Sequence, residues 1–426
     1  MDGLTYTFVV LATLVFTISI LCAQSYGLGG IGTGAGGGPA GGARAGSVKE
    51  TPGSFFYSTL LLLMTLVLGV FLSIDLIMFY ICFESSLIPM YLLIGIYGGR
   101  SRKKHAANIL FLMTLAGSLS TLIAFLVIIS EIGYRDLITT SNLIISENRQ
   151  LLLWLALFIS FGLKTPLIPF HVWLPEAHTE ANVSGSIILA GILLKLASYG
   201  FIRFSIGLLE MSSLYFTPLI YGLSTISILY SSISTLRQID LKKIIAYSSI
   251  GHMSIVNLGI FSNNIIGMEG GIYLMIAHGI VSPALFILVT VLYDRFHTRI
   301  IKYYRGMVNI MPVYGIYLLL FTLANMAIPF TGNFIGELLS LTGTMSKNPL
   351  ITLLAALGII LAGGYSIWFQ NRVLYGKLTK HIKKVVSDKP RSPSRWCPSP
   401  DQNSGGTGGG TPATTSREAK AHSLLG

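Results

Sequence analysis

The chain has 426 residues, of which 52% are hydrophobic and only 11% are charged, and its mean hydropathy is +0.70. This composition excludes an ordinary soluble domain and predicts an all-α polytopic membrane protein. The formal net charge is +12. No nucleic-acid motif accompanies the basic residues, so the charge is interpreted as a topology signal and no nucleic-acid partner is expected. The three cysteines show no metal- or cofactor-binding spacing, so we expect neither group on this chain.

The apolar runs predict about eleven transmembrane helices, because a crossing needs about 20 residues at 1.5 Å rise each. The predicted spans are 4–23, 55–74, 75–97, 106–130, 150–172, 184–207, 213–236, 243–262, 268–293, 311–345 and 350–375. Residues 1–23 lack a basic n-region and a clear cleavage site, so they are expected to form a retained transmembrane helix. The span 311–345 is too long for one crossing unless it breaks, and Pro329, Gly332 and Gly336 are the candidate breaks.

The predicted spans divide the chain into five regions. The N-terminal helix is followed by a glycine-rich loop at 24–54, a first five-helix repeat at 55–207 and a second, inverted repeat at 208–376. Residues 377–426 are rich in Ser, Pro, Gly and Thr and are expected to be disordered. Most loop arginines and lysines fall on one side of the predicted topology, which should face the cytoplasm or the matrix. We call this side the basic side.

A short pattern recurs at an offset of five spans. Ile168-Pro169-Phe170 interrupts the fifth span, close to Lys164 and Pro166, and Ile328-Pro329-Phe330 interrupts the tenth, close to Glu337. Because five is odd, the two copies enter the membrane in opposite directions. The pattern predicts an antiporter-like inverted repeat with two proline-broken helices, an arrangement that marks the binding path in transporters. A break beside a lysine also frees backbone groups and admits water, although a proline kink can serve packing alone.

Six ionisable residues lie in otherwise apolar runs. Burying a charge there costs at least about 2.5–3.5 kcal/mol, so such residues are candidates for proton transfer. They are Glu84, Lys164, Lys195, His252, His278 and Glu337. The alternatives are snorkelling for the lysines, hydrogen-bonded burial for the glutamates and ordinary packing for the histidines. A switchable Glu84–Lys164 pair is a further hypothesis. For His171 and His178, near a span end, placement at the membrane interface is the favoured interpretation.

Seven stretches resemble one family of membrane proteins. They are DGLTYTFVVLATL, FESSLIPMYLLIGIYG, GLKTPLIPFHVWLPEAH, SGSIILAGILLKLASYG, DLKKIIAYSSIGHM, IAHGIVSPALFIL and PFTGNFIGELL. The chain resembles subunit 4 of proton-pumping NADH:ubiquinone oxidoreductase, respiratory complex I, an antiporter-like relative of the Mrp sodium/proton antiporter subunits. HVWLPEAH and AGILLKLASYG are the specific stretches, and the resemblance covers the membrane part to about Gly376.

The resemblance implies roles for the six ionisable residues. Glu84 and Lys164 match the family's Glu/Lys pair, Lys195 its connecting lysine, and Glu337 the terminal proton residue of the second broken helix. His252 and His278 match positions of a central hydrated axis. The family usually has fourteen spans, and we expect its first two and its last to have no counterpart here. The family also commonly has proline where this chain has Asn182.

The expected function follows from this resemblance. The chain is expected to translocate protons as a subunit of NADH:ubiquinone oxidoreductase, driven by electron transfer in other subunits and without redox chemistry of its own. FMN, iron–sulfur clusters and ubiquinone are expected in partner subunits, and the neighbours are expected to be subunits 2 and 5 and lipids. The expected location is the mitochondrial inner membrane, or alternatively a bacterial plasma membrane. The alternative functions are a cation/proton antiporter subunit of Mrp type and a non-pumping structural subunit.

Overall fold

The computed structural model describes residues 2–26, 53–99, 101–137, 139, 146–379 and 381–382. Most of the glycine-rich loop and of the C-terminal tail lies outside these residues. Eight helices in the described part are long and apolar enough to cross a membrane. A chain that crosses a lipid bilayer must satisfy its backbone polar groups internally, and helices do so within one segment.

The first half of the chain forms a run of helices. They are α1 (Gly3–Tyr26), α2 (Ser54–Leu72), α3 (Leu76–Ser85), α4 (Leu87–Gly95), α5 (Lys103–Ile132), α7 (Glu147–Lys164), α8 (Trp173–Glu180), α9 (Val183–Ile188), the π-helix η1 (Leu189–Leu193), α10 (Leu194–Gly200) and the π-helix η2 (Phe201–Ile206). The elements from α9 to η2 form one continuous span of 24 residues, and α3 and α4 likewise form one of 20 residues.

The second half contains longer helices and one break. Its elements are α11 (Glu210–Arg237), α12 (Leu241–Ile260), α13 (Ile265–Phe296), the short 3-10 helices η3 (Ile301–Tyr303) and η4 (Met307–Asn309), α14 (Pro312–Asn325), α15 (Gly332–Met345) and α16 (Pro349–Leu374). Every predicted span has a counterpart among the described helices. The eight long apolar helices account for eight of them, and α7, α12 and the α14–α15 pair account for the rest.

Both predicted helix breaks are present. The fifth span is interrupted between α7, which ends at Lys164, and α8, which begins at Trp173. Pro166 and Pro169 lie in the intervening segment, which contains a cis Ile168–Pro169 bond. The tenth span is interrupted between α14, which ends at Asn325, and α15, which begins at Gly332, and Pro329 lies in this segment. The prediction that Gly336 contributes to this break is wrong, because Gly336 lies inside α15.

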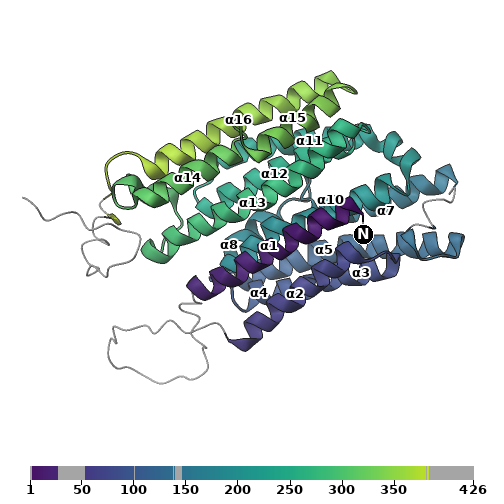
Figure 1. The fold of residues 1–426 in the computed structure, drawn as a ribbon, viewed down its shortest axis with the longest axis horizontal. Helices are drawn as coiled ribbons and strands as arrows, with labels where there is room; N and C mark the ends of the chain where they lie inside the picture. Colours follow the sequence, from purple (N-terminus) through teal and green to yellow (C-terminus); the bar gives the residue numbers. More distant parts are fainter. Residues whose placement is uncertain are drawn as a thin grey trace, which may run out of the picture. The chain divides into compact units, whose positions relative to one another are not determined.

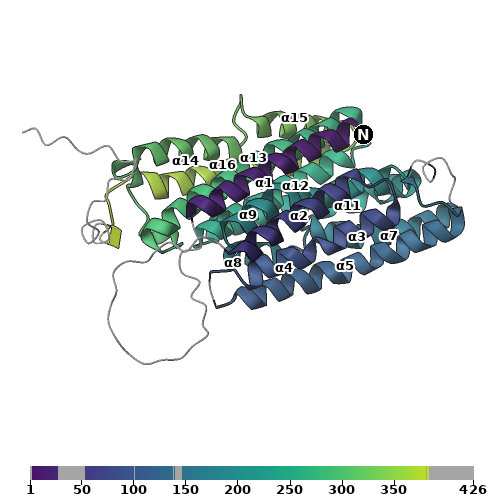
Figure 2. The ribbon, with the colours of Figure 1, turned by 60° about the horizontal axis from the view of Figure 1, so that its bottom comes forward.

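The helices pack side by side in two groups (Figures 1 and 2). In the first group α2 packs on α3 and α4, and α5 packs on α7; in the second α13 packs on α12 and α15, and α11 on α12 and α16. Helix α1 lies between the groups, against α2, α9 and α13. The contact zone between the groups contains α9, α10, α12 and α13, and three of the six candidate proton residues lie on these helices.

Candidate functional site

Four of the six predicted residues form a buried line across three helices and the second broken span. The Nζ atom of Lys195 in α10 lies 2.9 Å from Nδ1 of His278 in α13. The imidazole rings of His278 and His252 have centroids 5.4 Å apart. His252 in α12 then contacts Glu337 in α15, with 2.8 Å between Nδ1 and Oε1. Each of these four residues is at most 4% exposed, so the line runs through the protein interior.

Lys195 is held by the π-helix that precedes it. Its ammonium group donates to the carbonyl oxygen of Ala190, which lies in η1, as well as contacting His278. A π-helix turn is rare in proteins and frequently occurs at functional sites. The irregular turn thus supplies an acceptor that keeps a fully buried ammonium hydrogen-bonded.

Helix α15, which carries Glu337, approaches α13 closely. A Cβ atom at Gly336 would lie 2.7 Å from the Cα atom of Leu274 in α13, nearer than real contacts allow. A Cβ at Gly270 would likewise collide with the backbone nitrogen of Ser340 in α15. Small residues of this kind let helix backbones come together in membranes. The glycine next to Glu337 therefore lets α15 lie directly against α13.

The Glu84–Lys164 pair is present but open. The ammonium group of Lys164 donates to the carbonyl oxygen of Phe83 at 3.2 Å and lies 3.1 Å from the centroid of the Phe83 ring. Both carboxylate oxygens of Glu84 are buried without a hydrogen-bond partner, yet the carboxylate is within electrostatic range of Lys164. The predicted partners are therefore neighbours in the fold, and the salt bridge between them is not formed in this state.

The first broken helix satisfies its freed backbone groups with side chains. The indole nitrogen of Trp173 donates to the carbonyl oxygen of Leu163 at 2.8 Å, and the backbone N–H of Ile168 donates to the hydroxyl of Ser227 in α11 at 2.9 Å. Broken helices at membrane depth require such replacements. They hold Lys164, the last residue of α7, at the open end of a helix.

A mainly apolar cavity lies between Lys164 and the helix of Lys195. It is lined by Lys164, Ser86 and Trp173 on one side and by Leu193 and Leu196 on the other. No hydrogen bond between side chains of the described residues crosses it, so the Glu84–Lys164 pair and the four-residue line are two separate sets of residues.

His178 is a further candidate residue, for which the sequence favoured a place at the membrane interface. Its ring is fully buried, stacks on Phe286 with 4.4 Å between centroids, and leaves both nitrogens without a hydrogen-bond partner. It lies within electrostatic range of Lys195 and of Lys242, whose ammonium group is held by the carbonyl oxygen of Ala181. Sequence spacing gave no sign of this, because only the fold brings α8 against α12 and α13.

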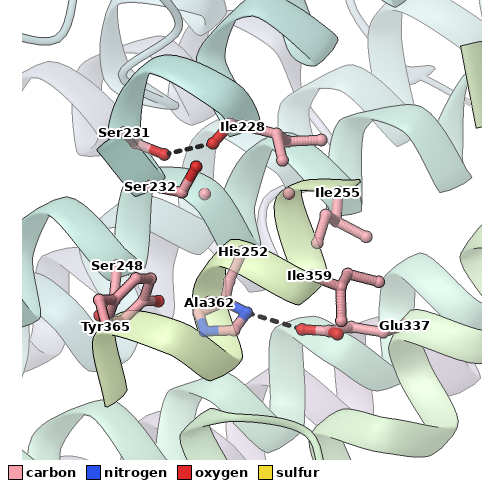
Figure 3. Close-up of a pocket in the computed structure, with 12 residues that line it drawn as sticks. Ile228, Ser231, Ser232, Ser248, His252, Ile255, Glu337, Ile359, Ala362 and Tyr365 are labelled. Carbon is pink, nitrogen blue, oxygen red and sulfur yellow. Dashed lines mark hydrogen bonds and ion pairs between the residues drawn. The ribbon is translucent and has the colours of Figure 1, made fainter. Parts of the chain in front are cut away.

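A second cavity opens beside the His252–Glu337 contact (Figure 3). Its polar walls are Ser231 and Ser232 from α11, Ser248 from α12 and Tyr365 from α16. None of these residues was singled out in the sequence, where serines in apolar helices are common. Among the described residues no group of three His, Cys, Asp or Glu side chains is arranged to hold a metal ion.

Known proteins resemble this chain over most of its length. Residues 73–362 match the sequence model of the family described as NADH:quinone oxidoreductase/Mrp antiporter, TM. NADH-ubiquinone oxidoreductase chain 4 of Marchantia polymorpha is 54% identical over 321 residues, which are 75% of this chain and 65% of that protein. The Arabidopsis thaliana protein of the same name is 47% identical over 387 residues, 91% of this chain and 74% of that one. The chain thus spans about two thirds of the length of the Marchantia relative.

Two solved structures share the fold. A chain of respiratory complex I from Thermus thermophilus with bound NADH superposes with a TM-score of 0.79 at 28% identity, covering 91% of this chain and 79% of that one. A chain of the Mrp complex from Dietzia sp. DQ12-45-1b superposes with a TM-score of 0.77 at 19% identity, covering 89% of this chain and 67% of that one. The second likeness concerns the fold alone.

Proposed function

Because the chain belongs to the NADH:quinone oxidoreductase/Mrp antiporter transmembrane family, we propose that it translocates protons as a membrane subunit of NADH:ubiquinone oxidoreductase. One observation carries the proposal: Lys195, His278, His252 and Glu337 form a buried sequence of acid–base groups, with hydrogen bonds at both ends and adjacent imidazole rings in the middle. Ionisable groups buried in this way are costly, and a connected series of them is the arrangement that proton relays use.

The transfer proceeds by exchange between neighbouring groups. An ammonium proton of Lys195 passes to Nδ1 of His278, leaving a neutral amine and an imidazolium. His252 accepts the proton from His278 and delivers its own Nδ1 proton to the Glu337 carboxylate, which becomes a carboxylic acid. Water must bridge the two rings, because both Nε2 atoms are buried without a protein partner.

The Glu84–Lys164 pair acts as the switch upstream of this line. With the salt bridge open, as here, the ammonium of Lys164 keeps only the Phe83 carbonyl and ring, and the loss of the carboxylate favours release of its proton. Closing the Glu84–Lys164 salt bridge restores the positive charge of Lys164. Wetting of the apolar cavity beside Lys164 would then connect the switch to Lys195.

Energy for transport comes from partner subunits. Moving one charge against 100 mV costs about 2.3 kcal/mol, and this chain has no redox centre in its proposed role. We place FMN, iron–sulfur clusters and ubiquinone in other subunits, and the antiporter-like subunits 2 and 5 beside this one in the membrane arm. The chain resides in the mitochondrial inner membrane as a multi-pass protein.

Replacing Lys195 by methionine in the assembled complex tests the function. Lys195→Met keeps the length of the side chain and removes the ammonium, so the rate of NADH-driven proton pumping into vesicles should fall by about a hundredfold or more. Lys347→Met is the matched control, because Lys347 is exposed in the segment between α15 and α16. The amount of assembled complex is measured in parallel by native electrophoresis.

The outcomes separate the proposal from its alternatives. Pumping at the wild-type rate in Lys195→Met would show that the chain is a structural subunit. Ion transport that requires sodium and continues without NADH would show that it is an antiporter subunit. Loss of pumping with normal assembly, unaffected by sodium, supports the proposed role.

A further inference from the structure

A cluster of aromatic and charged side chains lies beyond Lys195, on the way to the membrane side opposite the basic side. Tyr199 and Arg203 follow Lys195 at four and eight positions along the same span, so the three side chains share one face of it. At 1.5 Å per residue, Arg203 lies about 12 Å beyond Lys195. On the predicted topology this span runs away from the basic side, which places Arg203 between Lys195 and the opposite side.

Hydrogen bonds hold the polar atoms of the cluster in place. The Nε atom of Arg203 donates to the hydroxyl of Tyr199 at 3.2 Å, and this hydroxyl donates to the carbonyl oxygen of Phe71 in α2 at 3.3 Å. An Nη atom of Arg203 lies 2.8 Å from a carboxylate oxygen of Asp2, just before α1. The guanidinium carbon is also 5.5 Å from the centroid of the Tyr199 ring. One arginine therefore connects the span of Lys195 to α1 and α2.

Three aromatic rings pack together at the level between Lys195 and Arg203. The rings of Phe8 in α1 and Phe71 in α2 are stacked with 5.4 Å between centroids. The Tyr199 ring meets both of them edge to face, at 5.9 and 5.2 Å. Each of the three residues is buried. Rings packed at these distances exclude water, and the one hydroxyl among them has already donated its hydrogen.

The positive charge of Arg203 is compensated only from outside. Its partner Asp2 has a side chain that is 70% exposed, whereas the Arg203 side chain is 19% exposed. Water screens the charge of an exposed group, so the mostly buried guanidinium keeps a positive potential toward Lys195. A fixed arginine of this kind excludes protons from water pores. At about 12 Å and an effective dielectric constant of about 20, two unit charges repel strongly enough to change a rate about tenfold.

We propose that Arg203 and the rings of Phe8, Phe71 and Tyr199 form a seal that prevents protons on the side opposite the basic side from reaching Lys195. The proposal rests on the proposed function and adds a barrier against backflow, which a pump needs because the membrane potential favours the return of each proton. Arg203 acts through its fixed charge and exchanges no proton, because a guanidinium stays protonated in proteins.

A plain tether for the start of α1 is the alternative role of the cluster. A tether needs Asp2 and Arg203 equally, because either substitution breaks the same salt bridge. A seal needs the charge of Arg203 and the aromatic rings but not the carboxylate of Asp2. Variants at the two ends of one salt bridge therefore separate the two roles.

The rate of proton leak through the assembled complex tests the seal. The complex is placed in proteoliposomes without NADH, under an imposed potential that is positive on the side opposite the basic side. Arg203→Gln removes the charge and should raise the leak about tenfold. Arg203→Lys keeps the charge and should leak at close to the wild-type rate. Asp2→Asn breaks the salt bridge but leaves Arg203 charged, and should leak no more than the wild type. Native electrophoresis measures the amount of complex.

A double variant tests the route of the leak. Adding Lys195→Met to Arg203→Gln removes the group that accepts the returning proton, so the leak should fall back to the wild-type rate. Arg149→Gln is the matched control, because Arg149 is an exposed arginine that pairs with Glu131 at the surface and has no contact with the cluster. This variant should not leak.

A further variant covers a failure of Arg203→Gln to assemble. Tyr199→Leu removes the ring and the hydroxyl but retains an apolar side chain, and should raise the leak several-fold, with reversal by Lys195→Met. A wild-type leak rate in assembled Arg203→Gln, or in Tyr199→Leu where only that variant assembles, overturns the seal. An equal rise in leak in Asp2→Asn and Arg203→Gln also overturns it, in favour of a tether. If Lys195→Met stops pumping while these variants stay tight, the seal fails and the proposed function survives.

Discussion

At the residue scale, the ionisable groups of the membrane part differ in how their charge is compensated. Glu337 is held by His252, and Lys195 by His278 and a π-helix carbonyl. The ammonium group of Lys164 contacts only the carbonyl oxygen and the aromatic ring of Phe83, and the carboxylate of Glu84 has no hydrogen-bond partner. An unpaired buried charge is costly, so the Glu84–Lys164 region is the least compensated part of the proposed path.

His178 is the residue whose interpretation the structure changes most. His178→Phe keeps a ring that can stack on Phe286 but removes both nitrogens, so packing is retained and any proton transfer is lost. A role of His178 in linking Lys242, on the basic side, to Lys195 predicts that pumping by a normally assembled His178→Phe complex falls by at least about tenfold. His105→Phe, at an exposed site on the basic side, is the control. A His178→Phe complex that pumps normally would restrict His178 to packing.

At the element scale, irregular helices position the site. The break after Lys164, the π-helix before Lys195 and the break before α15 each lie within one or two turns of a proton residue. Regular helices need no side-chain partners for their backbone, whereas these segments use Trp173, Ser227 and Lys195 as partners. The same irregularity that exposes polar backbone also provides acceptors for buried charges.

The close approach of α13 and α15 predicts the effect of a single methyl group. Gly336→Ala should force the two helices apart, since its Cβ would collide with the backbone of Leu274, and overpacking of this kind costs about 1–3 kcal/mol. The thermal stability of the complex and its pumping rate should both decrease. Gly364→Ala is the matched control, because its Cβ would meet nothing within 4 Å and alanine favours a helix by about 1 kcal/mol. Equal behaviour of the two variants would argue against the steric account.

At the scale of the whole molecule, two groups of helices each contribute one broken helix and part of the proposed proton path. The Glu84–Lys164 pair belongs to the first group and Glu337 to the second, with Lys195, His278 and His252 on the helices where the groups meet. Groups that carry a proton one after another act as a unit, so losses at different positions do not add.

This arrangement in series predicts the behaviour of a double variant. Lys164→Met and Glu337→Gln should each slow pumping strongly, and the double variant should be no slower than the worse single one. The measurement is the pumping rate of the assembled complex at equal amounts of complex. Additive losses, with the double variant slower by the product of both factors, would mean that the two residues serve independent paths.

The sequence by itself determined the helices, the two breaks and six of the ionisable residues in the interior, but not the burial of His178. Long apolar runs leave few alternatives to transmembrane helices, and prolines at Pro166, Pro169 and Pro329 interrupt them for local steric reasons. The boundaries of the two repeats stay a prediction, as do the roles of the six proton residues.

Only the tertiary structure decided which of these groups meet. Glu84 and Lys164 are 80 positions apart in the chain and His252 and Glu337 are 85 apart, so hydrophobic periodicity carries no information on their distance. The contact between His252 and Glu337 joins α12 to α15, and the burial of His178 depends on helices from the other group. The π-helix carbonyl that holds Lys195 and the cavity lined by serines and Tyr365 likewise arise from packing between helices, because a local sequence fixes a helix but not its neighbours.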